Sequence, residues 1–326
     1  MENVIGGSGV KVGFAAKSGH LPRLFLRAKG YAVGIDVSLL RSPLQCCNLF
    51  QATQIALQEM PIIPPGMKLL VKIKVGKTDS KPTFGYEGEN DVSIISIPPK
   101  VTHLPPEETA PIILHEMWHG YLAAAFPEQF DGLMTMFNAL ANIEWIDKSI
   151  NIAKEKILPI LKGLTDDCWL YSDMLKHGRQ HPFMSECKRE YVDTPEEDQI
   201  LKTNWPVCRS QLAAVLYSFA EEYMLVLLPY KITGNTVHPL LAGYYACRLA
   251  NFESSFPGIS RKLDECMELL VPTFSGDKVP NESVIIGLVD KFYGIGCLKR
   301  QAWPDLSFPY NKFIPDALLR RVRGGG

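Results

Sequence analysis

The chain has 326 residues, and its 46% hydrophobic content is enough to bury a sizeable core in one large domain or two smaller ones. Lysine and arginine number 34 against 35 acidic residues, so the net charge offers no electrostatic footprint for nucleic acid or an anionic membrane. Nucleic-acid partners are therefore disfavoured. The pattern predicts an N-terminal segment over 1–60, a core over 61–160 and a mostly helical region over 161–326.

The eight cysteines are scattered and include no CxxC pair, which argues against a zinc ribbon or a compact disulfide framework. Free thiols in a reducing compartment fit best. The N-terminus lacks the uninterrupted apolar core of a signal peptide. A later apolar run, 211–230, carries Glu221 and Glu222 at its middle, which favours a packed helix over a membrane span. We expect a cytoplasmic protein with no membrane partner and leave its oligomeric state open.

The first hundred residues change from an irregular to a strand-like pattern. Residues 1–35 are rich in glycine and fit either two short strands or a loosely packed arm. Ser42 can open a helix that ends before the proline-rich run 61–66. Residues 68–75 and 92–97 then read as strands, because both are rich in apolar and β-branched side chains. The polar stretch between them suits a turn and an exposed edge strand, whose backbone could pair with an extended peptide.

A helix is predicted next, capped by Thr109 and stopped by Pro127. It contains the motif HEMWH, with His115 and His119 at its two ends. Residues four apart lie one above the other on a helix, so both imidazoles can reach a single metal ion. The other residues on that face are mostly apolar, which predicts that the two histidines point inward.

This spacing suits a catalytic zinc site. Zinc in such a site takes three protein ligands and keeps a fourth position for water, whose pKa it lowers toward neutrality. Glu116, beside the first histidine, can take a proton from the attacking water and pass it to the leaving amine. The alternative is an inert pair of buried histidines; composition alone would place the pattern in a chain of this length about once in a hundred.

The third ligand must return to the metal from outside the first helix. A second helix is predicted over 128–157, and Glu144 lies beside its apolar face, far enough along for the chain to turn back. Asp147, one turn further on, either binds the metal instead or orients a ligating histidine. Glu128 and Asp131 lie too close to the end of the first helix.

These residues resemble the zincin metallopeptidases whose third zinc ligand is a glutamate. A closer resemblance covers roughly residues 60–150, with LPPEETAPIILHEMWH and FNALANIEWID after two strands and a Gly-containing edge segment. This order is similar to metallopeptidase domains of bacteria and phages that often precede a von Willebrand-like domain. It implies zinc bound by His115, His119 and an acid. NALANIEWID departs from that family's usual acidic cluster, so Glu144 and Asp147 both stay candidates, and the DxSxS motif of the associated domain is missing.

Residues 160–300 read as mostly helical and would complete a cleft. His177 and His181 repeat the four-residue spacing, and a second metal or a substrate-binding pair is one interpretation. Gly178 and Pro182 do not favour a regular helix there, so we interpret these residues as exposed loop histidines. The predicted helices of this region cover 161–176, 211–230, 239–251 and 260–270.

Three polar features of this region remain. Zincins commonly stabilise the oxyanion with a tyrosine or histidine from a later helix, and Tyr245 or His238 could do so here. Tyrosines on an apolar helix are more often core residues, however. Glu221 and Glu222 either support a ligand or form the edge of an amphipathic face. The tail LLRRVRGGG resembles the end of ubiquitin-like modifiers, and we interpret it as a flexible basic terminus.

Together these patterns predict an α+β fold with a zincin-like core, in which a small twisted sheet lies above the HExxH helix. The predicted function is a zinc-dependent metallopeptidase acting on a peptide or protein substrate. Zn²⁺ would be bound by His115, His119 and Glu144 or Asp147, with Glu116 as general base. One alternative is a catalytically silent zincin-fold protein with a binding or assembly role, against which the intact Glu116 argues. Another is a DNA-associated protease, which no basic patch supports.

Overall fold

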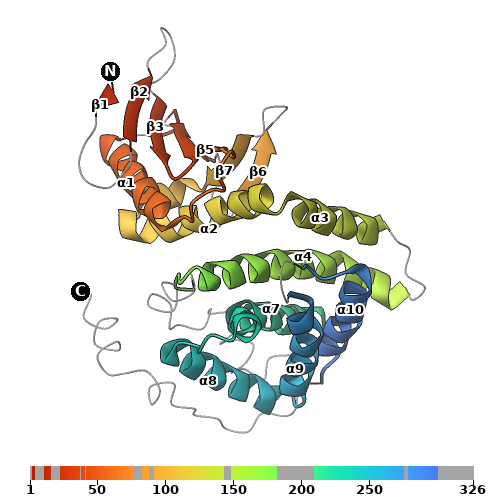
Figure 1. Cartoon of the computed structure of the whole chain (residues 1–326). Coiled ribbons are helices and arrows are strands. Elements are labelled where there is room, and N and C mark those ends of the chain that lie inside the picture. The colour runs from red at the N-terminus through yellow and green to blue at the C-terminus, as the bar shows by residue number, and fades with distance from the viewer. Residues whose placement is uncertain are drawn as a thin grey trace, which may run out of the picture. The chain divides into compact units, whose positions relative to one another are not determined.

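The computed structural model shows an α+β protein, as predicted (Figure 1). The chain divides into two compact units, unit 1 (Met1–Phe130) and unit 2 (Asp131–Gly326). The segment expected to stand apart, 1–60, shares unit 1 with the HExxH helix, because strands on either side of residue 60 pair with each other. The residues that the structure describes are 2–3, 11–15, 23–36, 38–40, 42–76, 83–87, 92–142, 148–181, 209–274 and 278–299.

Unit 1 is built on a seven-stranded mixed sheet in the order β1-β2-β3-β4-β5-β7-β6. β4, β5 and β7 are parallel, and antiparallel strands extend the sheet on both sides. The sheet is larger than predicted, because the residues up to 36 supply four strands. The strands are β1 (Glu2–Asn3), β2 (Lys11–Ala15), β3 (Arg23–Ala28), β4 (Tyr31–Asp36), β5 (Leu69–Val75), β6 (Thr83–Glu87) and β7 (Val92–Ile97).

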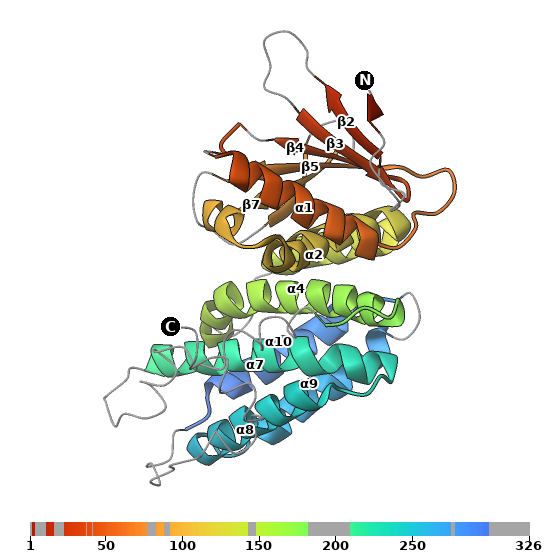
Figure 2. The ribbon, with the colours of Figure 1, turned by 90° about the vertical axis from the view of Figure 1, so that its left-hand side faces the viewer.

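One face of this sheet is buried under two helices. Alternate residues of β4, namely Tyr31, Val33 and Ile35, are at most 2% exposed, and β5 buries every second side chain in the same way. The helices α1 (Pro43–Glu59) and α2 (Pro106–Ala125) pack against each other and lie on the same side of the sheet (Figure 2). The apolar core of unit 1 therefore lies between this sheet face and the helix pair.

The predictions for the middle of unit 1 are confirmed in detail. α1 begins after Ser42, whose Oγ accepts a hydrogen bond from the Gln45 N–H while the Gln45 side chain accepts one from the Ser42 N–H. The two predicted strands form as β5 and β7. The predicted edge strand is β6, which pairs antiparallel with β7 and ends the sheet on that side.

Among the described residues of unit 2, all the regular secondary structure is helical. α4 packs along α7, α10 packs against α4, α7 and α9, and α8 packs against α9. The helix expected over 128–157 corresponds to α3 and the first part of α4, with residues 143–147 outside the described residues, and α4 continues through the helix expected over 161–176. The helices of unit 2, with α3 starting at the boundary, are α3 (Pro127–Asn142), α4 (Lys148–Lys176), α7 (Arg209–Thr233), α8 (Pro239–Ser255), α9 (Ile259–Leu270) and α10 (Glu282–Gly296).

α7 packs closely in unit 2 and contains Pro229. Tyr217 of the same helix lies against Gly296 at the end of α10, and a Cβ added at Gly296 would overlap the Tyr217 hydroxyl. Protein interiors are close-packed, so this contact requires glycine at that position.

α7 is also the one helix, among the described residues, that is long and apolar enough to cross a membrane by length and composition. The stretch that meets this test is Leu212–Thr233, and more than half of it is buried inside the protein. The core helix of a bundle has the same length and composition, and α7 contacts α4, α9 and α10.

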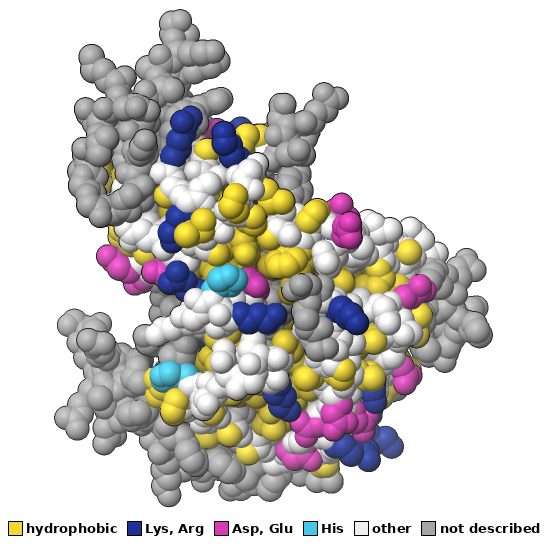
Figure 3. Space-filling model, in the orientation of Figure 1, with side chains coloured by type: hydrophobic (Ala, Val, Ile, Leu, Met, Phe, Trp, Pro, Cys, Tyr) yellow, Lys and Arg dark blue, Asp and Glu magenta, His cyan; other side chains and the backbone are white. Residues whose placement is uncertain are grey.

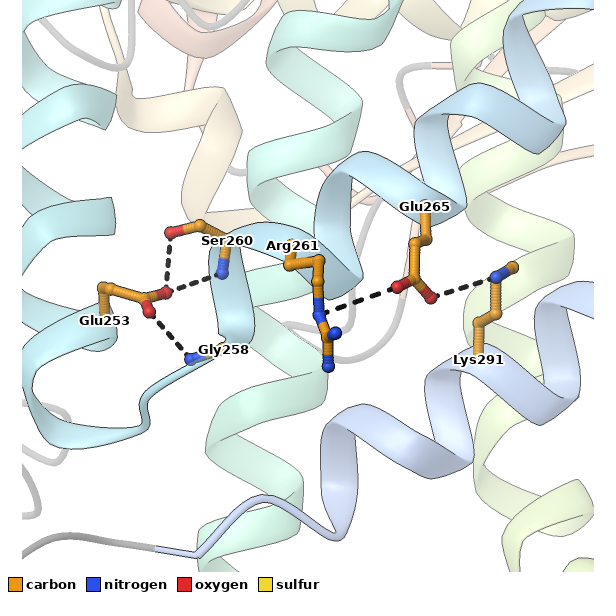
Figure 4. A network of polar contacts seen from close by, with 6 residues as sticks. All are labelled: Glu253, Gly258, Ser260, Arg261, Glu265 and Lys291. Carbon is orange, nitrogen blue, oxygen red and sulfur yellow. Dashed lines mark hydrogen bonds and ion pairs between the residues drawn. The ribbon is translucent and has the colours of Figure 1, made fainter.

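Charged side chains of both signs gather on unit 2 in the region of α9 and α10 (Figure 3). Glu265 accepts a hydrogen bond from Lys291 Nζ at 3.1 Å and lies 3.8 Å from Arg261 Nε (Figure 4). A further ion pair joins Lys231 and Asp264 at 3.8 Å. These side chains lie at the surface, exposed or partly so, and each pair therefore contributes little to stability.

The carboxylate of Glu253 caps the N-terminus of α9. Glu253 of α8 accepts hydrogen bonds from the Gly258 N–H at 2.7 Å, the Ser260 N–H at 2.8 Å and the Ser260 hydroxyl at 2.7 Å (Figure 4). Gly258 is the cap residue of α9 and Ser260 lies in its first turn, where N–H groups have no intrahelical acceptor. Burial opposes ionisation of Glu253, but the three hydrogen bonds outweigh it and hold the pKa of this carboxyl below its usual value.

Candidate metal centre

α2 carries the HExxH motif in the middle of an unbroken helix. It begins at Pro106 and ends at Ala125, directly before Phe126 and Pro127. The prediction that Thr109 caps this helix is wrong, because Thr109 lies inside it and its hydroxyl donates to the Val101 carbonyl at 3.1 Å. The start is fixed instead by Pro106, which suits the first helical position.

His115 and His119 turn their Nε2 atoms toward each other, 3.2 Å apart. Their ring centroids are 4.8 Å apart and the ring planes lie at 84°. His119 is 6% exposed and His115 is half-buried. The predicted convergence of the two imidazoles is therefore present in unit 1.

The separation of these nitrogens fits a shared metal ion. A zinc ion held tetrahedrally at about 2.0–2.1 Å from two nitrogens would place them about 3.3 Å apart. Imidazole nitrogen is also a donor that zinc and other divalent transition metals prefer. The same separation is that of an N–H···N hydrogen bond between the rings. The geometry thus accommodates an ion of any of these metals.

Glu116 lies on the same turn of α2 and is 6% exposed. Its neighbours Met117 and Trp118 are fully buried, and Trp118 contacts Tyr121 edge to face at 5.9 Å between ring centroids. These large side chains fix the rotation of α2 about its axis and, with it, the direction of the two histidines. Glu116 is therefore a buried carboxylate at a defined position beside a potential ligand.

The predicted third ligands, Glu144 and Asp147, lie outside the described residues, in the stretch 143–147 between α3 and α4. Within the described part of unit 1, no further histidine, cysteine or carboxylate joins the histidine pair to make a group of three. The third ligand therefore remains a prediction.

Tyr245, a candidate for stabilising the oxyanion, lies in the core of unit 2. It is 1% exposed and its hydroxyl donates to Glu222 Oε1 at 2.6 Å. Arg248, 3% exposed, donates to the same oxygen and lies over the ring of Phe219 and those of two tyrosines. Any oxyanion role for Tyr245 requires its hydroxyl to leave Glu222. An arginine on an apolar helix is the only sign in the sequence of the ion pair between Arg248 and Glu222.

His238, the other oxyanion candidate, occupies the cap position of α8. Its Nδ1 accepts a hydrogen bond from the Leu240 N–H at 3.2 Å. Because Nδ1 accepts, the proton of the neutral ring is on Nε2. Glu221, the other acid of the predicted pair, faces Gly163 of α4, where an added Cβ would lie 3.8 Å from Glu221 Oε1.

The two histidines of the second pair differ in their exposure to solvent. His177 is exposed, as predicted, and its Nδ1 lies 2.9 Å from the Asp173 carbonyl oxygen. The prediction for His181 is wrong: this residue is 1% exposed, with its ring 4.5 Å from that of Tyr171 and stacked on Tyr230. α4 ends at Lys176, so the two side chains do not share a helix face.

His181 has a specific structural role that the sequence could have indicated. Its Nε2 lies 3.0 Å from the Leu225 carbonyl oxygen. In a regular α7 that oxygen would accept from the N–H four residues later, but the residue there is Pro229, which has no N–H. His181 supplies the missing donor, so its Nε2 carries a proton.

Six cysteines are described, and all six are thiols outside any disulfide, as predicted. Burial raises the pKa of Cys168 well above its usual value, and that of Cys266 to about 12. Thiols with raised pKa values stay protonated at neutral pH and are poor nucleophiles and metal ligands. These two cysteines are therefore core residues.

Comparison with known proteins leaves the site to be interpreted from its own geometry. The chain matches none of the protein-family models, curated proteins or solved structures with which it was compared.

Proposed function

We propose that this protein is a zinc-dependent metallopeptidase. The observation that carries the proposal is the pair of imidazole nitrogens 3.2 Å apart on the HExxH helix. Glu116, which lies between the two histidines in the sequence, is buried. This is the residue set and spacing of the zincin peptidases that the sequence resembles. His115 and His119 would hold the ion, and Glu144 or Asp147 would complete the protein ligands.

The chemistry divides between the ion and the chain. Zinc, when bound, is a Lewis acid that polarises a carbonyl group and lowers the pKa of a water molecule. Glu116 would accept the proton of the attacking water and deliver it to the nitrogen of the departing amine. A carboxylate held in a water-poor position is suited to this transfer, because its orientation is fixed by the packing of α2.

The position of β6 supports a peptide as substrate. β6 ends the sheet, so its outer side pairs with no other strand among those described, and it contacts α2. An extended peptide can add to such an edge through backbone hydrogen bonds, which recognise a main chain rather than one side chain. The proposed substrate is therefore a peptide or an unfolded stretch of protein in extended conformation.

Replacement of Glu116 by Gln tests the mechanism. The variant should bind as much zinc as the wild type and cleave a quenched fluorescent peptide library at least about a thousandfold more slowly, because it cannot take up the proton. Glu107→Gln, an exposed change on the first turn of the same helix, is the matched control and should leave cleavage unchanged. Cleavage at the wild-type rate by Glu116→Gln would disprove the mechanism. A zinc-loaded wild type that cleaves nothing would favour the silent binding protein.

Alanine replacements at Glu144 and Asp147 test the third ligand. Loss of zinc in one variant identifies the ligand, and the other variant then serves as its control. If both variants retain full zinc, neither residue is the ligand. Asp166 and Asp167, two consecutive acids of α4, are then the next to replace.

A further inference from the structure

The prolines of the segment that follows α1 restrict it to an extended backbone with about three residues per turn. Pro61, Pro64 and Pro65 each fix φ near −65°. The residue before a proline is also excluded from the helical region. Met60, the first residue so restricted, has φ −64° and ψ 146°, the values of a polyproline II helix.

The exposure of this segment has the period of a polyproline II helix. That helix has three residues per turn, so Met60 and Ile63 lie on one of its faces. Both are buried, at 0% and 5% exposure. On the other faces, Pro61 is half-buried, Ile62 is 74% exposed, and Pro64 and Pro65 are also exposed. One face of the segment is therefore packed into unit 1, and the other two are presented to solvent.

The start and the middle of the segment are held by hydrogen bonds to Lys29. The Ile63 N–H donates to the Lys29 carbonyl at 3.1 Å, and Lys29 Nζ donates to the carbonyls of Gln58 at 2.6 Å and Met60 at 2.8 Å. Gly30 allows this approach, because a Cβ there would lie 2.9 Å from Ile63 Cβ.

The other end closes in a tight turn. The Met67 N–H donates to the Pro64 carbonyl at 3.1 Å, and Gly66 between them has φ +92°. Proline followed by a glycine of positive φ is the pattern of a type II turn. The extended stretch from Pro61 to Pro65, which we call the proline ridge, is thus anchored at both ends.

We propose that the proline ridge is a docking surface for a protein module with a shallow groove lined by aromatic rings, of the SH3 or WW kind. Such grooves recognise exposed polyproline II segments, and their binding is favoured when the ligand is ordered beforehand. Here the fold of unit 1 orders it. The apolar surface continues beyond the ridge through Met67 and Leu70, 45% and 43% exposed, and Lys68 beside them is a cation that favours an acidic groove rim.

Binding of the full-length protein to a panel of purified SH3, WW and EVH1 domains, measured by biolayer interferometry, tests this proposal. At least one domain should bind, and Ile62→Ser and Pro64→Ala should each weaken that binding about tenfold or more, since each removes an exposed contact. Pro257→Ala, at an exposed proline between α8 and α9, is the control and should bind like the wild type.

Ile62 is 74% exposed, so its replacement should leave the melting temperature and the zinc content unchanged; both are measured to show that the variant is folded. The proposal is overturned if no domain of the panel binds the wild type. It is equally overturned if Ile62→Ser and Pro64→Ala bind as tightly as the wild type does.

Discussion

The chain contains two pairs of histidines four residues apart, one in each unit, and the structure uses them in opposite ways. In unit 1, His115 and His119 turn their ring nitrogens toward each other at 3.2 Å. In unit 2, His177 is at the surface while His181 is buried and bonded to a backbone carbonyl. Identical spacing in the sequence thus gives a candidate metal centre in one unit and a structural hydrogen bond in the other.

The difference lies in the helix beneath each pair. α2 runs unbroken past both histidines of the first pair, so the helical period places them on one face. α4 ends one residue before the second pair, and Gly178, with φ +70°, redirects the chain. A four-residue spacing therefore predicts shared coordination only where the helix continues through it.

The largest expected effect is on zinc affinity, which should depend on the first histidine pair and not on the second. His119→Ala should lower zinc affinity by about a hundredfold or more, because it removes one of the two converging nitrogens. His177→Ala should leave affinity unchanged. Competition with a chromophoric zinc chelator measures both values. An equal loss in the two variants would show that the distinction between the pairs is wrong.

The next effect concerns stability. His181→Ala removes a buried ring and leaves the Leu225 carbonyl without the donor that replaces the N–H missing at Pro229, so unit 2 should lose about 3 kcal/mol. His177→Ala should change the free energy of unfolding by less than about 0.5 kcal/mol, because its ring is exposed. Urea denaturation followed by circular dichroism gives both values. A His181→Ala variant as stable as the wild type would refute the role of this hydrogen bond.

A smaller, pH-dependent effect is expected in unit 2. The pKa of Glu253 is lower in the folded protein than its ordinary value of 4.5, so its contribution to stability is complete above about pH 4.5 and is lost as the pH falls through the folded pKa. Glu253→Gln should therefore destabilise the protein at pH 7, by no more than about 0.5–1 kcal/mol since the carboxylate is partly screened. The difference should shrink toward pH 3. Thermal melts at the two pH values measure it, and a difference that grows on acidification would contradict the assignment.

The smallest effect is expected in the sheet of unit 1. Ser93 of β7 is 0% exposed, and its hydroxyl has no hydrogen-bond partner among the described residues. Ser93→Ala should therefore leave stability unchanged or raise it by up to about 1 kcal/mol. Denaturant titration checks this, with Thr53→Ala as the comparison, because the Thr53 hydroxyl is buried and bonded to Leu49 O at 2.7 Å. A clear destabilisation by Ser93→Ala would mean that the hydroxyl has a partner.

Short-range signals in the sequence predicted the local structure that holds the candidate site. The cap at Ser42, the strands β5 and β7, the edge strand β6 and the helix face of His115 and His119 all follow from turn chemistry and side-chain periodicity. Each depends on residues within a few positions of one another. That is why they could be read without knowledge of the fold.

What the sequence did not predict depends on partners distant along the chain. The four N-terminal strands gain their stability from pairing with the strands that follow, and glycine hides their pattern. Burial of His181 depends on a carbonyl 44 residues away. The ion pair of Arg248 depends on Glu222, which is 26 residues away on a different helix. Tertiary contacts of this kind decide whether a polar residue is exposed, and local patterns do not contain them.

The contact between Tyr217 and Gly296 has an evolutionary consequence. No side chain larger than a hydrogen atom fits at position 296 while a phenol occupies position 217. In homologous chains, the two positions should therefore change together or not at all, with a larger residue at 296 appearing only where 217 has become small. A collection of such sequences would show this as covariation between two helices that are remote in the chain.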